Sequence, residues 1–190
     1  MTTFALVHGA YGAGAQWAPL VAELEARGHT ALAPDLPIED RSATFADYAD
    51  AVGDCDHVVG HSMGGVTAAL VAARRGVPVT YVAALIPRPG RPLTEVLAEA
   101  IAPAVVASET KGDDGLRRQP DGPRGQAVTP YFDPFELDAV PAGPYVLCLR
   151  DEVVLPAYSR AAAPAAIVEL DCGHYPMREA PAALAEVLCG

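Results

Sequence analysis

The sequence predicts an α/β fold in which a mostly parallel sheet of about six strands carries helices on both faces. Short apolar runs suited to buried strands alternate along the chain with longer Ala- and Leu-rich segments suited to helices. One of the strand-to-helix junctions reads Gly60-His61-Ser62-Met63-Gly64, which places a serine between two glycines on a tight turn. With 190 residues the chain is long enough for one domain, residues 1–190, around a single core.

The individual elements follow from apolar runs and from the residues that bound them. Strands are expected at 3–8, 30–33, 57–59, 79–85, 145–149 and 166–170. Helices are expected at 16–27, 45–52, 63–75, 156–162 and 181–188. Gly28, Gly53 and Gly76 mark helix ends and Pro181 a helix start, which agrees with the usual positions of these residues.

Ser62 is the candidate nucleophile, and a serine hydroxyl needs a base, an acid that orients the base, and donors for an oxyanion. The predicted base is His174, in the loop after the last expected strand, and the predicted acid is Asp151, in the loop after the strand before it. All three residues follow the carboxyl ends of strands, where ligand sites of parallel sheets gather. Glu152 and Asp171 remain alternatives to Asp151, because Glu152 is its neighbour and Asp171 lies three residues before His174, and either could pair with the imidazole if the loops bend differently.

The chain order Ser, Asp, His with a glycine-flanked serine resembles the α/β-hydrolases, and within them the branch of plant methylesterases, hydroxynitrile lyases and small esterases. The matching segments are residues 4–10, Gly60-His61-Ser62-Met63-Gly64-Gly65, Asp151-Glu152 and Gly173-His174. The resemblance implies that the backbone amides of Ala10 and Met63 form the oxyanion hole. It also implies a lid insertion, here at about 88–141 and short for the family. Within it, the Leu, Val and Ala content predicts one or two helices at 93–106, and the Gly, Pro and charge content predicts a mobile loop at 108–130.

Two positions separate the chain from the hydroxynitrile lyases that it resembles. Those enzymes carry an acidic residue before the nucleophile and a lysine after the catalytic histidine, whereas this chain has His61 and Tyr175 at these places. The resemblance therefore implies an esterase-like serine hydrolase that needs no cofactor and binds no metal. By position, the expected substrate-binding residues are Tyr11, His61, Leu85, Val153 and Tyr175.

Charge and composition exclude several other classes of protein. The net charge of −11 and the scattered basic residues argue against nucleic acid as a partner. No apolar stretch reaches the roughly 20 residues of a transmembrane helix, and the first strand begins too early for a signal peptide. The four cysteines lack metal-ligand or redox spacing, so we expect reduced thiols in a cytoplasmic protein. The sequence leaves the oligomeric state undecided; a homodimer is one possibility, because a second subunit would cover apolar surface that a short lid exposes.

The expected function is hydrolysis of carboxylic esters or lactones of small to medium molecules through an acyl-enzyme. The alternative is a non-hydrolytic homologue that acts as a small-molecule receptor or as a biosynthetic cyclase or lyase on the same fold. A dinucleotide site is disfavoured, because Gly9, Gly12 and Gly14 give the spacing G-x-x-G-x-G instead of G-x-G-x-x-G.

Overall fold

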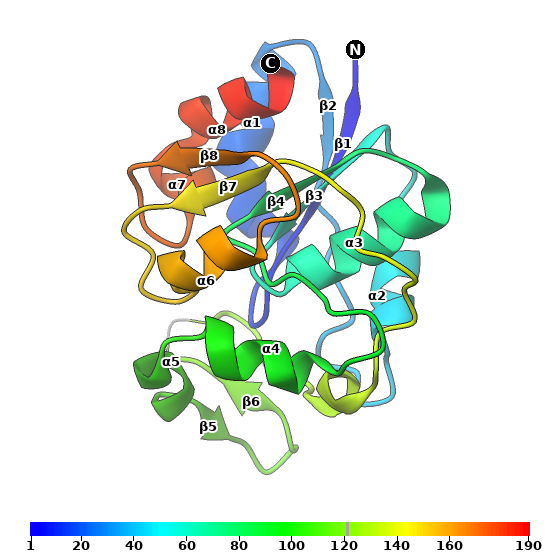
Figure 1. The fold of residues 1–190 in the computed structure, drawn as a ribbon, viewed down its shortest axis with the longest axis vertical. Helices are drawn as coiled ribbons and strands as arrows, with labels where there is room; N and C mark the ends of the chain where they lie inside the picture. Colours follow the sequence, from blue (N-terminus) through cyan, green and yellow to red (C-terminus); the bar gives the residue numbers. More distant parts are fainter. Residues whose placement is uncertain (121) are drawn as a thin grey trace.

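The computed structural model describes residues 1–120 and 122–190, and its centre is a parallel sheet of six strands (Figure 1). The strand order is β2-β1-β3-β4-β7-β8, and every pair of neighbours is parallel. The bounds are β1 Thr3–Val7, β2 Thr30–Leu32, β3 His57–His61, β4 Val79–Val82, β7 Tyr145–Cys148 and β8 Ile167–Leu170. The α/β fold with about six parallel strands is confirmed.

Helices cover both faces of this sheet, because the strands bury side chains on both sides. In β1, Ala5 and Val7 belong to the core cluster beneath α2 and α3, whereas Phe4 and Leu6 belong to the cluster beneath α1 and α8. The helices that flank the sheet are η1 Gly14–Trp17, α1 Ala18–Ala26, α2 Phe45–Asp50, α3 Gly64–Arg75, α6 Pro156–Ala162, α7 Pro176–Glu179 and α8 Pro181–Cys189.

Local sequence explains where several helices begin and end. Thr44 and Asp47 form a reciprocal capping box at the start of α2, which satisfies amides that the first turn leaves free. Gly76 ends α3 at a φ of 68°, in the left-handed region that glycine adopts without a steric penalty. The expected helix at 16–27 instead starts as the 3₁₀ turn η1, and α7 was not expected because its single turn is too short to show a periodic pattern.

The long insertion lies between β4 and β7 and contains more regular structure than the sequence predicted. Its elements are α4 Leu93–Ala100, α5 Pro103–Ala107, β5 Thr110–Lys111, β6 Arg117–Arg118 and η2 Thr129–Phe132. The helices at 93–106 agree with expectation. The expected loop at 108–130 contains regular structure that the sequence did not predict, because β5 and β6 form an antiparallel hairpin and the Arg117 and Gln126 backbones exchange hydrogen bonds of 2.9 and 2.8 Å.

The helices of the described residues are too short or too polar to cross a lipid bilayer. The elements α4, α5, β5 and β6 lie together at one end of the molecule, at the bottom of Figure 1.

Candidate active site

Ser62 occupies a strained turn between β3 and α3. Its φ is 54°, a left-handed conformation that costs a non-glycine residue about 1–3 kcal/mol. Backbone hydrogen bonds hold the turn: Ser62 N–H donates to Val82 O at 3.2 Å, and Ser62 O accepts from the amides of Gly65 at 3.0 Å and Leu85 at 2.9 Å. The turn therefore presents the hydroxyl at the carboxyl edge of the sheet, as a nucleophile elbow requires.

The glycines around Ser62 are needed because backbone from three segments converges there. A Cβ at Gly60 would lie 2.6 Å from Gly64 O, and a Cβ at Gly64 would lie 2.5 Å from the carbonyl oxygens of both Val7 and His8. No side chain fits at such distances without moving backbone. The glycine positions of the motif thus have a direct steric cause.

His174 and Asp151 form a buried pair beside this turn. His174 Nδ1 lies 2.9 Å from Asp151 Oδ2, and the two side chains are 6% and 3% exposed. The other carboxylate oxygen accepts the backbone amides of Val153 at 2.8 Å and Val154 at 2.9 Å. Because an ionised carboxylate only accepts hydrogen bonds, His174 carries its proton on Nδ1, and its Nε2 remains available to take a proton.

The two alternative acids point elsewhere. Asp171 forms an ion pair of 2.9 Å with Arg150, and its side chain is 79% exposed. Glu152 is also exposed. Of the three acids weighed from the sequence, Asp151 is the one hydrogen-bonded to His174.

His61 holds the loop that carries His174. It is 1% exposed, its Nε2 lies 2.7 Å from the backbone oxygen of His174, and its Nδ1 lies 3.4 Å from Gln16 Nε2. Burial, and then the nearby His174, lower the pKa of His61 well below 6.5, so its ring is neutral and Nε2–H donates to the carbonyl. The predicted substrate-binding residue His61 is thus buried against the loop that carries His174.

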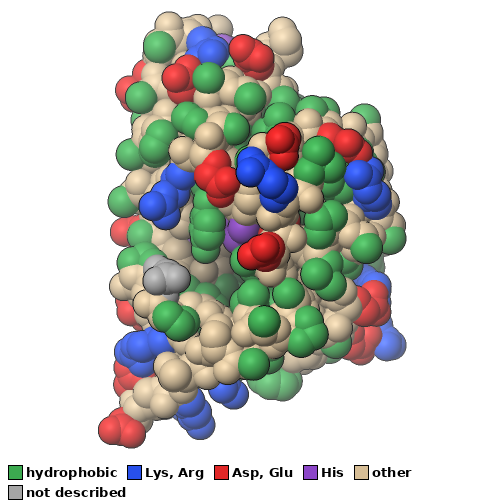
Figure 2. Space-filling view, turned by 90° about the vertical axis from the view of Figure 1, so that its left-hand side faces the viewer, with side chains coloured by type: hydrophobic (Ala, Val, Ile, Leu, Met, Phe, Trp, Pro, Cys, Tyr) green, Lys and Arg blue, Asp and Glu red, His purple; other side chains and the backbone are tan. Residues whose placement is uncertain are grey.

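This contact brings the His174 loop next to the nucleophile, because His61 is the residue before Ser62. The rings of His61 and His174 are 4.5 Å apart. Within the described residues no hydrogen bond joins Ser62 Oγ to the His174 ring, and such bonds commonly tighten only when substrate binds. Figure 2 shows a hollow in the molecular surface with a histidine side chain at its base.

The loop after β1 is ordered by His8. His8 Nε2 accepts the Leu36 amide at 3.0 Å, so its Nδ1 carries the proton and donates to Gly9 O at 2.8 Å. Within the described part of the chain, the amides of Ala10 and Met63 donate to no other residue. Both are therefore available to an oxyanion.

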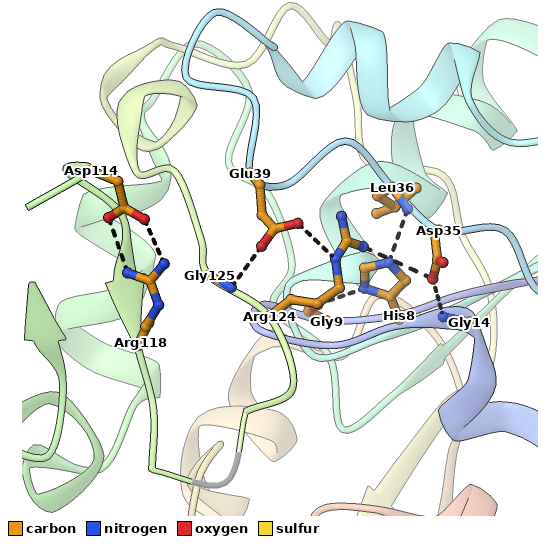
Figure 3. Close-up of polar contacts among 10 residues, drawn as sticks. All are labelled: His8, Gly9, Gly14, Asp35, Leu36, Glu39, Asp114, Arg118, Arg124 and Gly125. Carbon is orange, nitrogen blue, oxygen red and sulfur yellow. Dashed lines mark hydrogen bonds and ion pairs between the residues drawn. The ribbon is translucent and has the colours of Figure 1, made fainter. Parts of the chain in front are cut away.

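A polar strap, which we define as Arg124 and Gly125 with Glu39 and Asp35, ties the insertion to the loops at the sheet edge (Figure 3). Arg124 Nε lies 3.3 Å from Glu39 Oε2 and its Nη1 lies 3.9 Å from Asp35 Oδ1, and the Gly125 amide donates to Glu39 Oε1 at 3.2 Å. Asp35 also accepts the Gly14 amide at 2.7 Å. Sequence reasoning missed this strap, because no local pattern links residues so far apart.

The remaining predicted substrate-binding residues differ in their surroundings. Tyr11 has a φ of 60°, and its hydroxyl donates to Glu109 Oε1 of the insertion at 2.7 Å. Leu85 is 1% exposed within the core, and Val153 is half-buried beside the acid. Tyr175 is 41% exposed, and its ring lies 5.0 Å from that of His174.

Comparison with known families identifies the family of the chain. The model of a family described as the alpha/beta hydrolase family matches residues 4–187. The chain belongs to this family. A search of curated proteins gives no significant match.

Solved structures of this hydrolase fold resemble the chain over nearly its whole length. A pyrethroid hydrolase from Sphingobium faniae JZ-2 is 24% identical with a TM-score of 0.82, covering 99% of this chain and 96% of the other. Polyneuridine aldehyde esterase is 18% identical with a TM-score of 0.76, covering 100% and 98%. A methylesterase from Arabidopsis is 17% identical with a TM-score of 0.75, also covering 100% and 98%. These similarities confirm the fold that the sequence predicted.

Proposed function

We propose that this protein hydrolyses carboxylic esters or lactones of small to medium molecules by two-step acyl transfer. The observation that carries the proposal is the buried 2.9 Å contact between His174 Nδ1 and Asp151 Oδ2 next to the strained Ser62 turn. Membership of the alpha/beta hydrolase family supports it. So do the solved structures of similar fold, which include a pyrethroid hydrolase, polyneuridine aldehyde esterase and a methylesterase.

In the first step, Ser62 Oγ attacks the ester carbonyl while His174 Nε2 takes the hydroxyl proton. Asp151 stabilises the imidazolium that forms and holds the ring in the tautomer with Nδ1 protonated. The amides of Ala10 and Met63 donate to the oxyanion. Loss of one such donor typically costs about 10²–10³ in kcat.

The tetrahedral intermediate collapses when His174 passes its proton to the departing alcohol, which leaves an acyl-enzyme on Ser62. A water molecule then repeats the sequence: His174 removes its proton, the oxygen attacks the acyl carbonyl, and Ser62 leaves as the alcohol. Every proton moves through His174, so the reaction needs no cofactor in this scheme. A lactone follows the same course, with its alcohol still attached to the acyl group.

Residues 88–141 act in this proposal as a lid over a single hydrolase domain. Contacts at the oxyanion loop support this role, because Tyr11 hydrogen-bonds to Glu109 and the Arg124 amide donates to Tyr11 O at 3.3 Å. Tyr175, partly exposed beside the His174 ring, would form a wall of the acyl site.

The test is hydrolysis of para-nitrophenyl acetate and butyrate by the wild type, Ser62→Ala and the control Ser42→Ala, with labelling by a fluorophosphonate. Ser42 is an exposed serine that hydrogen-bonds to Asp40, outside the proposed site. We expect turnover and one label in the wild type and in Ser42→Ala, and neither in Ser62→Ala. A folded wild type that neither turns over nor labels would overturn the proposal in favour of the receptor or cyclase alternative.

A further inference from the structure

A cluster of basic side chains without partners lies at the β5–β6 hairpin of the insertion. Arg41, Lys111 and Arg117 have no carboxylate, backbone or ring partner for their charged groups among the described residues. Every other arginine in the chain has one: a carboxylate for most of them, backbone carbonyls for Arg75, and the ring of Tyr175 for Arg178. In a chain with a net charge of −11, unpaired cations at one place require an explanation.

These three side chains line the same cavity, whose volume is about 310 Å³. Lys111 and Arg117 are directly opposite each other in the β5–β6 hairpin. Like charges at such a cross-strand position destabilise a hairpin unless something compensates them. Arg41 reaches the same hairpin from the loop before α2, because its guanidinium carbon lies 3.2 Å from the place of a Cβ on Gly115. The fold therefore gathers three repelling cations around one hollow.

The rest of the lining accepts both polar and apolar groups. Thr129 contributes a hydroxyl, and Ala127, Val128 and Phe132 contribute apolar surface. Phe132 is 66% exposed, which is unusual for an aromatic side chain and leaves its ring available to a ligand. Among the residues that the structure describes, no carboxylate lines the cavity. None of the proposed catalytic residues lines this cavity, so it is separate from the site beside Ser62.

We propose that this cavity binds a small phosphate monoester whose organic part is apolar or aromatic. Two guanidinium groups and one ammonium group match a dianion with several acceptor oxygens, because arginine donates to phosphate through paired N–H groups. The ring of Phe132 and the side chain of Val128 would contact the organic part. The volume is at the lower end of the range for small-molecule sites, which limits the ligand to a compact molecule.

The test uses phenyl phosphate as the probe in isothermal titration calorimetry with the full chain. We expect saturable binding that weakens at least about tenfold in Arg117→Gln and in Lys111→Gln, since each loses a charge-assisted interaction. The matched control Arg27→Gln removes the same charge at a surface ion pair and should change the affinity less than about twofold. Ser62→Ala should bind the probe like the wild type. Circular dichroism establishes that each variant is folded.

Two further ligands separate the contributions of charge and ring. Inorganic phosphate should bind more weakly than phenyl phosphate and compete with it, and phenol should not compete. The proposal is overturned if no saturable binding is seen up to about 10 mM phenyl phosphate. A dissociation constant of that size corresponds to a binding free energy of only about −2.7 kcal/mol. It is equally overturned if Arg27→Gln weakens binding as much as Arg117→Gln, or if Ser62→Ala abolishes binding.

Discussion

Replacing Asp151 by asparagine changes a single atom in the proposed site and reverses the proton arrangement of His174. Asp151 Oδ1 accepts two backbone amides, from Val153 at 2.8 Å and Val154 at 2.9 Å. In Asp151→Asn the amide oxygen must keep these two donors, because an NH₂ group there would face two N–H groups. The new NH₂ group then faces His174 Nδ1 across the 2.9 Å contact.

This geometry forces His174 into the tautomer that cannot act as a base toward Ser62. His174 Nδ1 must accept a hydrogen bond from the new amide, so the ring proton moves to Nε2, the atom that should take the proton of Ser62. We expect kcat for para-nitrophenyl acetate to fall by about 10⁴, the size of the effect when a triad aspartate becomes asparagine. The backbone bonds survive, so the loss of stability should stay within about 1–3 kcal/mol. Thermal unfolding measured beside the kinetics separates the two effects.

Matched variants at the two alternative acids complete the experiment. Glu152→Gln and Asp171→Asn make the same chemical change at exposed positions, and each should leave kcat within about threefold of the wild type, as surface substitutions usually do. The reasoning fails if folded Asp151→Asn keeps more than about a tenth of the wild-type activity, or if Asp171→Asn loses as much as Asp151→Asn.

Three other predictions concern stability and reactivity. Gly64→Ala should lower the free energy of unfolding, measured in urea, by about 1–3 kcal/mol or more. The control Gly53→Ala, whose Cβ would contact only Leu32 Cδ1 at 3.7 Å, should change it little. Equal losses in the two variants would contradict the explanation that backbone crowding requires glycine at position 64. Burial lowers the pKa of His8 and of His61 below 6.5 in the folded protein, so on acidification these histidines are protonated in the unfolded chain before they are protonated in the folded one. The free energy of unfolding should therefore be fully maintained above pH 6.5 and decrease below it. A free energy of unfolding that is constant from about pH 7.5 to 5 would exclude this linkage. Cys189 is exposed and should react with a thiol reagent in the native protein well before the buried cysteines, and simultaneous labelling would count against the packing described.

The sheet and the strained turn at Ser62 were predictable because their signals are local. Each strand is a short apolar run, and the glycines beside Ser62 report a steric constraint within a few residues of sequence. The sequence favoured Asp151 but left Asp171 as an alternative, because the final choice depends on the direction in which each loop turns. Asp151 faces inward because the Val153 and Val154 amides bind its carboxylate, whereas Arg150 draws Asp171 to the surface.

The insertion shows why a polar, glycine-rich sequence need not be unstructured. Residues 108–130 lack the apolar run that would predict an element, yet Glu39 lies 85 residues before Arg124 and binds its side chain. Such contacts depend on the fold that brings the two loops together, so no window of sequence contains them. The same strap hydrogen-bonds to the loop after β1 through the Arg124 amide and Tyr11 O. The proposed lid is therefore linked directly to the loop that carries the Ala10 amide, and we expect a change in the position of either to alter the other.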